Sequence, residues 1–517
     1  MPCFTTHSLI SSIILPENRL VATSPILETS HETITMMLRF LRFCFLSTAI
    51  TSCVAFQSAD AGQPTGIVPN PLDKYVAEPD DCYKWELLEI AEIQSFQFRV
   101  IKLTSQKWRS EKDVDRPIWE HLLVVTIPPE VKSTSAFLLI GGGSHNSKPP
   151  RGPDPIAAGI AKATGSIVAE LKNVPNQPLV FHNDGQPRTE DDLIGYSWAQ
   201  FLETGDPTWL PRFPMAKSAV RAMDCITEFA ASEAGGKHKV EKFVVGGGSK
   251  RGWTTWITGA VDDRVEAIVP IVIDVLNVEP SLTHHGRAYG FWAEAIGNYY
   301  QHKILQRFDH PRMKELYALV DPLSYKDRLT MPKYIVNGVG DQFFLPDSSQ
   351  FYWDQLKGKK LIRYVPNADH GLKDSDAAQS IATFHYLISS GKSLPEYDWT
   401  FEQDGSIKVT TGETPAKVVM WQANNPNARD FRLQSIGPAF KPTELIRRED
   451  GSYVAPAAPE MKGWTATYVE LSFPVEGQYP LKVSTAVKVT PSTLPYAELD
   501  PKTIKYEPEV KQGGLKN

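Results

Sequence analysis

A serine stands in a glycine-rich turn between a predicted buried strand and a predicted helix. The stretch reads Val244-Val245-Gly246-Gly247-Gly248-Ser249-Lys250-Arg251-Gly252-Trp253. Small residues are needed in such a turn because its backbone is strained and closely packed. The serine could act as a nucleophile, and the start of the helix could stabilise developing negative charge. The pattern is typical of the nucleophile elbow of α/β-hydrolases, although the usual second glycine is replaced by Arg251 and follows at Gly252.

Two other glycine-rich motifs do not match this stretch. A phosphate-binding loop needs the sequence Gly-Lys-Ser/Thr, which is missing here, and a dinucleotide fingerprint needs a glycine where Arg251 stands. The remaining alternative is a plain glycine-rich turn in which the serine has no chemical role.

An acid and a histidine follow two later predicted strands. Asp341 comes after the strand Tyr334–Asn337, and His370 lies in the loop after the strand Leu361–Val365. The chain order Ser, Asp, His is that of α/β-hydrolases, and the carboxyl ends of parallel strands meet at one sheet edge. We therefore predict that Ser249 attacks the substrate, His370 takes its proton, and Asp341 orients the imidazolium.

Two other aspartates are alternatives for the acid. Asp274 ends the predicted strand Val265–Ile273 and is the runner-up. Asp369 is a weaker candidate because it is adjacent to His370, and adjacent side chains rarely face each other.

Backbone amides for an oxyanion hole are expected at two places. The stretch Gly141-Gly142-Gly143-Ser144 follows the apolar run Ala136–Ile140, which predicts a central strand. The N–H of Gly142 or Gly143, together with that of Lys250, would form the oxyanion hole. A plain strand-end turn is the alternative. The spacing of His, Cys, Asp and Glu predicts no metal site, and no cofactor is expected.

Strands and helices alternate over much of the chain, which predicts an α/β fold with a mostly parallel sheet covered by helices on both faces. This α/β-hydrolase domain is expected to span residues 62–395. Between residues 277 and 329 no strand is predicted, so we expect a helical cap insert there. The strands are predicted at 95–106, 119–127, 136–140, 166–169, 240–245, 265–273, 334–337 and 361–365, and the helices at 191–202, 213–229 and 249–260.

After Pro395 the pattern changes to short alternating segments separated by turn residues. This predicts a separate, Ig-like β-sandwich over residues 396–490. The Pro- and Lys-rich tail at 491–517 is expected to be loose. The sandwich strands are predicted at 399–402, 406–411, 417–422, 429–433, 465–473 and 481–489.

The N-terminal region carries an export signal. A short basic segment beginning at Met36 precedes an apolar run, and Ala59-Asp60-Ala61 is a small-x-small cleavage site. We predict a signal peptide over residues 36–61, which would make residues 1–35 a spurious extension. A disordered leader on a cytosolic protein is one alternative. A lipoprotein box with acylation at Cys53 is another, and it also implies export.

The composition limits the function classes. Of 517 residues, 42% are hydrophobic and 22% charged, as in ordinary globular proteins. The net charge is −6, so the chain has no overall basic field and nucleic-acid binding is not expected. Past the signal region no apolar stretch reaches the ~18 to 20 residues of a membrane span. The expected partner is therefore a small-molecule or peptide substrate.

Two further features are ambiguous in the sequence. The cluster His284-His285-Gly286-Arg287 lies in the cap insert and is either a recognition site for an anionic group or exposed loop polarity. Cys82 and Cys225 would sit in an oxidising compartment after export, but their distance in sequence does not establish whether they pair.

Four motifs stand in order along the chain: 190–198 (Glu-Asp-Asp-Leu-Ile-Gly-Tyr-Ser-Trp), 204–209 (Thr-Gly-Asp-Pro-Thr-Trp), 214–217 (Pro-Met-Ala-Lys) and 247–256 (Gly-Gly-Ser-Lys-Arg-Gly-Trp-Thr-Thr-Trp). They resemble motifs of the PhoPQ-activated pathogenicity-related protein family. The resemblance extends over residues 70–490 and implies an exported α/β-hydrolase-like bacterial protein. The family name describes regulation and virulence, and it implies no defined reaction.

From these observations we expect an exported serine hydrolase that cleaves an ester or amide bond through an acyl-enzyme. The alternative is a non-catalytic secreted binding or signalling protein on a hydrolase scaffold, linked to virulence or stress response. Fold alone does not decide between the two, because one scaffold can carry many functions.

Overall fold

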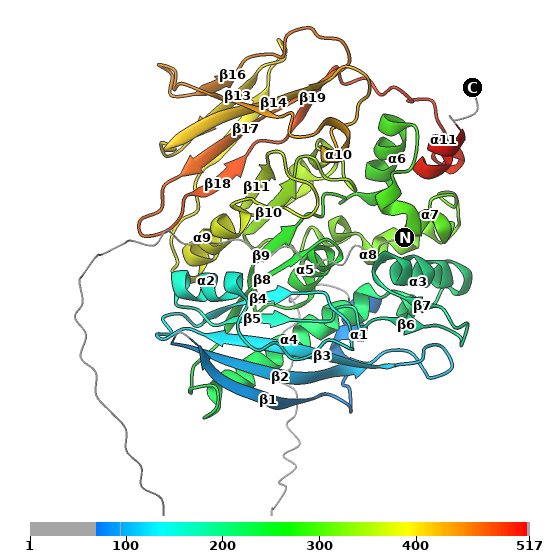
Figure 1. Cartoon of the computed structure of the whole chain (residues 1–517), viewed down its shortest axis with the longest axis vertical. Helices are drawn as coiled ribbons and strands as arrows, with labels where there is room; N and C mark the ends of the chain where they lie inside the picture. Colours follow the sequence, from blue (N-terminus) through cyan, green and yellow to red (C-terminus); the bar gives the residue numbers. More distant parts are fainter. Residues whose placement is uncertain (1–68, 94, 514–517) are drawn as a thin grey trace, which may run out of the picture. The chain divides into compact units, whose positions relative to one another are not determined.

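The strands predicted between residues 95 and 365 build one large mixed sheet. The computed structural model describes residues 69–93 and 95–513. Nine strands follow the order β1-β2-β3-β5-β4-β8-β9-β10-β11 (Figure 1). From β5 to β11 neighbouring strands are parallel, whereas β1, β2 and β3 join through antiparallel pairs. The strands are β1 Lys84–Ile93, β2 Phe96–Lys107, β3 Ile118–Ile127, β4 Ser135–Ile140, β5 Val168–Leu171, β8 Lys242–Gly248, β9 Val265–Ile271, β10 Lys333–Gly338 and β11 Lys360–Val365.

This sheet agrees with the α/β class and with a hydrolase-like scaffold. The β4-β8-β9-β10-β11 run has the continuous burial that apolar strands show when helices cover both faces. Every strand predicted before residue 366 is present, with bounds shifted by a few residues. The additional edge strand β1 has alternating exposure, so one of its faces is open to solvent.

Helices cover the sheet on both sides. On one face α2 packs against α9, and on the other α4 packs against α1 and α5 (Figure 1). The helix α2 was not predicted, although Asp154 caps it and Gly165 ends it in the left-handed conformation. The helices are α1 Pro71–Ala77, α2 Pro155–Thr164, α3 Glu190–Thr204, α4 Arg212–Ala231, α5 Lys250–Val261 and α9 Ala377–Ser389. A short hairpin joins β6 Leu179–Val180 and β7 Pro187–Arg188.

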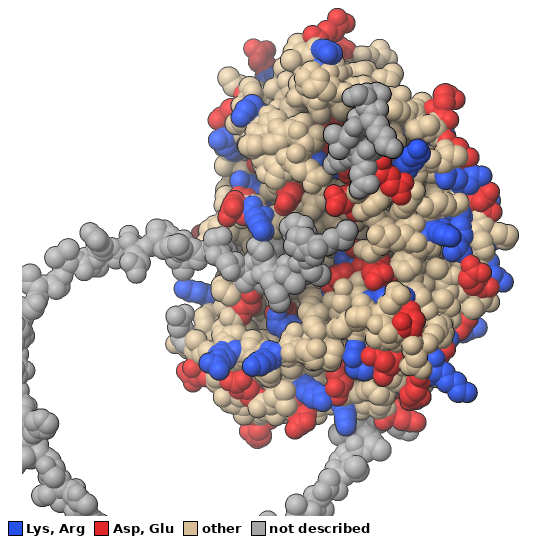
Figure 2. Space-filling model, turned by 45° about the vertical axis from the view of Figure 1, so that its right-hand side comes forward, with Lys and Arg blue, Asp and Glu red and all other residues tan. Residues whose placement is uncertain are grey.

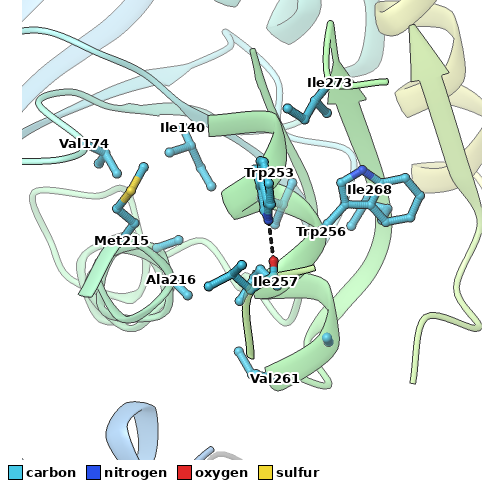
Figure 3. Close-up of a cluster of buried hydrophobic side chains, with 14 of the residues drawn as sticks. Ile140, Val174, Met215, Ala216, Trp253, Trp256, Ile257, Val261, Ile268 and Ile273 are labelled. Atoms are coloured by element: carbon cyan, nitrogen blue, oxygen red, sulfur yellow. Dashed lines mark hydrogen bonds between the residues drawn. The ribbon is translucent and has the colours of Figure 1, made fainter. Parts of the chain in front are cut away.

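Helix α5, which follows Ser249, is buried along its whole length. Figure 3 shows its side chains Trp253, Trp256 and Ile257 among apolar residues of the neighbouring elements. The indole N–H of Trp253 donates to the backbone oxygen of Val320 at 2.5 Å. A helix enclosed in this way cannot move without disturbing the core, so the turn that begins it is held rigidly.

The insert at 277–329 contains helices and no strand in the described chain. Two of its aromatic side chains, Tyr289 and Trp292, are buried and pack inside the protein. The insert comprises α6 Val278–Tyr289, α7 Gly297–Gln301 and α8 Met313–Val320, with short 3₁₀ turns at Glu294–Ile296 and Pro322–Tyr325.

Beyond residue 395 the chain forms two antiparallel sheets. One has the order β12-β13-β16 and the other the order β15-β14-β17-β18, with β19 paired to β17. The two sheets share apolar side chains in one buried cluster. This bears out the β character of the region, whereas an Ig-like sandwich is not established. The strands are β12 Tyr397–Phe401, β13 Ile407–Thr411, β14 Lys417–Asn425, β15 Lys441–Glu444, β16 Tyr453–Ala455, β17 Trp464–Phe473, β18 Leu481–Ser484 and β19 Lys488–Thr490.

The strand expected at 429–433 does not form. The Asn425 side chain accepts hydrogen bonds from the amides of Asn427 and Ala428, which turns the backbone away from the sheet. The short helix α10, Leu433–Ile436, follows.

The tail that we expected to be loose contains ordered elements. It holds a 3₁₀ turn at Pro501–Thr503 and α11, Glu507–Gly513, which lies beside α6 and α7 (Figure 1). Three cap glycines leave room for tail side chains. A Cβ atom on Gly286 would lie 2.4 Å from Ile504, and one on Gly297 would lie 2.4 Å from the Tyr506 hydroxyl. Gly290 faces the ring of Tyr496 in the same way.

Other features of the described chain bear on the remaining expectations. Cys82 and Cys225 are both free thiols. No helix in residues 69–93 or 95–513 is long and apolar enough to cross a membrane. On the face shown in Figure 2, basic and acidic side chains are interspersed. The predicted signal peptide and Cys53 lie outside the described residues.

Buried contacts join the two sides of residue 395. The Tyr334 hydroxyl on β10 donates to the Lys482 backbone oxygen at 2.6 Å, and the Ser484 hydroxyl accepts from the amide of Tyr364 at 3.0 Å. The apolar cluster shared by the two C-terminal sheets also includes residues of β8 to β11 and α9. The hydrolase sheet therefore depends on the C-terminal region for part of its burial.

A chain that ends after Pro395 should accordingly expose apolar surface of β10, β11 and α9. We expect this truncated protein to be largely insoluble, or to bind a hydrophobic dye that the full chain does not bind. Expression followed by sedimentation and dye fluorescence tests this. A soluble monomer with the full chain's melting behaviour for the remaining part would show that the two parts fold independently.

His385 on α9 is a buried titratable group without a hydrogen-bond partner. Its side chain is fully buried, neither ring nitrogen is bonded in the described chain, and the ring packs edge-on against Phe137 at 5.2 Å. Burial lowers the pKa of His385 to about 3, because the charged form is poorly solvated there.

His385→Phe should make stability less sensitive to acid. In the unfolded chain the histidine titrates near 6.5, so between that pH and about 3 unfolding takes up a proton and wild-type stability falls as the pH drops. His385→Phe cannot take up this proton. Its free energy of unfolding, compared with that of wild type, should therefore rise by roughly 2 kcal/mol between pH 7 and pH 5. Urea unfolding at both pH values measures this difference in free energy, and a difference that is equal at the two pH values would contradict the prediction.

Candidate active site

Ser249 occupies a strained turn between β8 and α5. Its φ is 58° and its ψ is −125°, a conformation that non-glycine residues rarely adopt. The turn is held because the Ser249 amide donates to the Ile271 oxygen at 2.8 Å and the Ser249 oxygen accepts from Trp253 at 3.0 Å. The side chain is partly exposed. Strand, strained serine and buried helix therefore follow one another in the order that the predicted nucleophile elbow requires.

The shifted glycine of the motif has a structural reason. A Cβ atom on Gly252 would lie 2.8 Å from the Gly247 oxygen, and one on Gly247 would lie 2.8 Å from the Arg251 oxygen. The two glycines therefore allow the first turn of α5 to approach β8 closely. The guanidinium of Arg251 extends to the Val174 oxygen and to the Glu190 carboxylate, so a large residue at position 251 has its own partners.

The structure brings His370 and Asp341 together. The His370 Nδ1 lies 2.7 Å from the Asp341 Oδ2, and both side chains are largely buried. The other carboxylate oxygen of Asp341 accepts from the Phe343 amide at 2.7 Å. The carboxylate is thus fixed in a turn after β10, and it favours the tautomer that carries a proton on Nδ1.

The second ring nitrogen of His370 is available for proton transfer. Nε2 is buried and has no hydrogen-bond partner in the described chain. No hydrogen bond joins it to the Ser249 hydroxyl among these residues, and in unliganded hydrolases such bonds are often long and tighten with substrate. The backbone brings the segments to one edge, because Ser249 bonds to the end of β9 and Val272 bonds to Val336 on β10.

Two neighbours of His370 were not predicted from sequence. The Gln342 side chain accepts from the His370 amide at 3.1 Å, and the Phe343 ring lies 4.3 Å from the imidazole. Both directly follow Asp341, so the loop that carries the acid also positions the histidine. Their position after the predicted strand end was the only sequence signal.

Asp274 is not a partner of His370. Its two carboxylate oxygens accept from the hydroxyls of Tyr352 and Tyr364 at 2.5 and 2.7 Å. Burial raises the pKa of Asp274 to about 7, against the opposing effect of these two hydrogen bonds. Asp369 accepts from the Gly371 amide instead. Of the three candidate acids, only Asp341 contacts the histidine.

The glycine loop after β4 presents free amides beside Ser249. Ile140 pairs with Gly247, so Gly142 and Ser249 stand two residues further along adjacent strands. The oxygens of Gly141 and Gly142 accept from Val174 and Asn173, which follow β5 on the other side of β4.

The direction of these amides follows from peptide geometry. In a trans peptide the C=O and N–H groups point in opposite directions. Since the carbonyls are turned toward the segment after β5, the amides of Gly142 and Gly143 face the β8 side. In the described chain no acceptor is bonded to these two amides or to that of Lys250. These are the three amides that the sequence predicts as oxyanion donors.

The side chains of Lys250 and Arg251 form ion pairs around the elbow. Lys250 Nζ lies 2.8 Å from Glu190 and 3.2 Å from Asp191, and Arg251 lies 2.6 Å from Glu190. Arg212 donates to the Lys250 backbone oxygen at 3.1 Å. These contacts hold the start of α5 and engage the side chains of both residues.

The histidine cluster in the cap is neither exposed polarity nor an open anion site. His284 is buried and bonds Asp347 at 3.1 Å, and Arg429 bonds the same carboxylate at 2.5 Å. His285 is buried and accepts from the Ala293 amide. The cluster is internal because the loop after β10 and the C-terminal region cover this side of the cap.

Solved structures with a similar chain path include two bacterial esterases. Acetyl xylan esterase 1 from Thermoanaerobacterium sp. JW/SL YS485 has 14% identity and a TM-score of 0.44, covering 64% of this chain and 95% of its own. An acetyl xylan esterase from Paenibacillus sp. R4 has 14% identity and a TM-score of 0.42, covering 62% and 90%. Likenesses of this size say nothing about activity.

Sequence relationships are much stronger. The chain is 39% identical over 459 residues to autocrine proliferation repressor protein A of Dictyostelium discoideum, covering 83% of this chain and 92% of the relative. A model of the PhoPQ-activated pathogenicity-related proteins matches residues 72–432, which is more than half of the chain and includes every predicted site residue. The chain therefore belongs to the PhoPQ-activated pathogenicity-related protein family.

Proposed function

We propose that this protein is an exported serine hydrolase that cleaves an ester or amide bond through an acyl-enzyme. The observation that carries the proposal is the bond between Asp341 and His370 at the sheet edge where Ser249 occupies its strained turn. A buried carboxylate–imidazole pair with a free Nε2 is the arrangement that a serine nucleophile needs.

In the proposed mechanism, the Ser249 hydroxyl attacks the substrate carbonyl and its proton passes to His370 Nε2. The Asp341 carboxylate stabilises the resulting imidazolium through Nδ1–H. The amides of Lys250 and of Gly142 or Gly143 would bind the oxyanion. The imidazolium then protonates the leaving group, and water releases the acyl group by the same steps in reverse order.

A second candidate function is signalling without catalysis. It is favoured by the name of the Dictyostelium relative, which describes repression of proliferation and no reaction. A binding protein could keep the hydrolase frame and its polar residues. Labelling with a fluorophosphonate separates the two candidates, because the probe reacts only with a serine that an adjacent base and oxyanion donors activate.

We also propose a C-terminal domain and an export signal. Residues 396–490 would form a β-sandwich domain, since the two C-terminal sheets share one apolar cluster. Residues 36–61 would form a signal peptide, with acylation at Cys53 as the alternative route of export.

The triad variants should lose labelling and turnover together. Ser249→Ala and His370→Ala should each lower turnover of p-nitrophenyl acetate on the order of 10⁶-fold, because the residues act as a unit. Asp341→Asn should cost about 10⁴-fold, because the histidine then adopts the wrong tautomer.

Asp274→Asn is the matched control for the acid, since Asp274 is a buried carboxylate bonded to tyrosines and not to His370. Its effect on kcat should be smaller than that of Asp341→Asn once the folded fraction is equal. A larger loss at Asp274 would show that the acid is assigned incorrectly. A wild-type protein that neither labels nor turns over would favour the signalling candidate.

Export should leave a shortened mature chain. We expect the N-terminus near Gly62, or at Cys53 carrying lipid, when the protein is expressed in a bacterium and the exported fraction is collected. Intact mass and N-terminal peptide analysis measure this. A cytosolic protein retaining residues 36–61 would refute the signal assignment.

A further inference from the structure

Glu190 contacts both residues that follow Ser249 and also Gln177, which is bonded to the glycine loop. It is the first residue of α3, far from Ser249 in sequence, and its φ of 53° lies in the left-handed region. A non-glycine residue in that conformation is strained, and such strain persists only where the surroundings impose it. The Glu190 amide donates to the side-chain oxygen of Gln177 at 2.8 Å, which fixes the backbone there.

The Glu190 carboxylate binds both residues that follow the serine. Arg251 makes a two-pronged contact, with bonds of 2.6 and 2.7 Å to the two carboxylate oxygens. Lys250 Nζ lies 2.8 Å from the second oxygen. Paired bonds of this kind fix orientation as well as distance. The first turn of α5, which carries the Lys250 amide, is therefore tied to Glu190.

The same carboxylate is linked to the glycine loop through the side chain of Gln177. Gln177 donates from its side-chain nitrogen to Glu190 at 2.6 Å and to the Gly143 backbone oxygen at 2.9 Å. The backbone oxygen of Gln177 accepts from the His145 amide at 2.9 Å. Arg251 also lies against this loop, since a Cβ atom on Gly142 would be 2.8 Å from its guanidinium.

The charges make this arrangement hard to replace. The side chains of Lys250 and Arg251 are almost fully buried. Burial alone would raise the pKa of Glu190, but the charges and hydrogen bonds of Arg251 and Lys250 hold it well below the ordinary value. Removing the carboxylate would leave the buried Arg251 guanidinium without its anion. Because an unpaired buried charge is costly, the guanidinium would shift to form other contacts. The neighbouring atoms available to Arg251 are those of the glycine loop.

We infer that Glu190 is the positioning residue of the oxyanion hole, because it ties the Lys250 amide and the Gly142–Gly143 loop to one carboxylate. The inference rests on the proposed hydrolase function for its kinetic consequence, though not for its structural one. Glu190 touches no reacting atom, so it acts only through the placement of the amides.

Glu190→Gln keeps the size and one hydrogen-bonding oxygen but removes the charge. For p-nitrophenyl acetate we expect kcat to fall about 10²-fold with KM nearly unchanged, as for loss of an oxyanion donor. Fluorophosphonate labelling of Ser249 should slow by a similar factor. Hydrogen exchange followed by mass spectrometry should rise in peptides covering 141–147 and 249–253.

Asp192→Asn is the matched control. Asp192 lies on the same turn of α3, but it pairs with His302 of the cap at 2.6 Å and does not contact the elbow. We expect it to leave kcat within about threefold of wild type, since no oxyanion donor moves, and to raise exchange only near residue 302. A general loosening of α3 would instead make the two variants alike.

Gln177→Leu is a second variant, which tests the link to the glycine loop even if Glu190→Gln does not fold. It cuts the link to Gly143 while the ion pairs of Lys250 and Arg251 remain. Exchange should then rise at 141–147 and not at 249–253.

Each outcome bears on one proposal. Unchanged exchange at 141–147 in both Glu190→Gln and Gln177→Leu would overturn the role of Glu190. A wild-type protein that is inert to substrate and probe would overturn the hydrolase proposal, and the exchange pattern would still decide whether Glu190 positions the loop.

Discussion

The strained backbone at Ser249 is the constraint on which the rest of the molecule depends. A φ of 58° with a ψ of −125° costs on the order of 1–3 kcal/mol, so it persists only if the surroundings leave no alternative. The ladder bond to Ile271 fixes one side of the turn, and the fully buried helix α5 fixes the other. Gly247 and Gly252 make this packing possible because neither has space for a side chain. The partly exposed Ser249 is thus held in place by a flanking strand and helix that are largely buried.

The loop after β10 is held in a different way, by parts of the chain that are distant in sequence. Asp341 and His370 come from loops after neighbouring strands, and the C-terminal region buttresses the acid-bearing loop at two points. The Leu433 amide donates to the Gly340 oxygen, and Arg429 bonds Asp347 beside His284. Through these two contacts the C-terminal region supports the placement of Asp341, in addition to covering part of the sheet.

Buried charges around the candidate site occur in compensated groups. Lys250 and Arg251 share Glu190, and Asp347 is shared by His284 and Arg429. An unpaired charge in these positions would be expensive, whereas a satisfied group specifies one geometry. His370 Nε2 is among the buried atoms that have no partner in the described residues, and the amides of Gly142, Gly143 and Lys250 bond no acceptor there. These four groups are the ones that the proposed mechanism uses.

The sequence by itself determined the strands of the large sheet other than β1, the turn at Ser249 and the candidates for acid and base, because these features depend on local periodicity and on glycine spacing. The sequence favoured Asp341 over Asp274, although both follow buried strands. Only three-dimensional packing shows that Asp341 contacts His370 and that Asp274 is bonded to two tyrosines. The burial of His284 and the ordered tail were likewise invisible, because each depends on surfaces contributed by distant segments. The same reason hid Glu190: its partners at Gln177, Lys250 and Arg251 have no fixed spacing in the chain, and only the fold brings their charges and hydrogen bonds to one carboxylate.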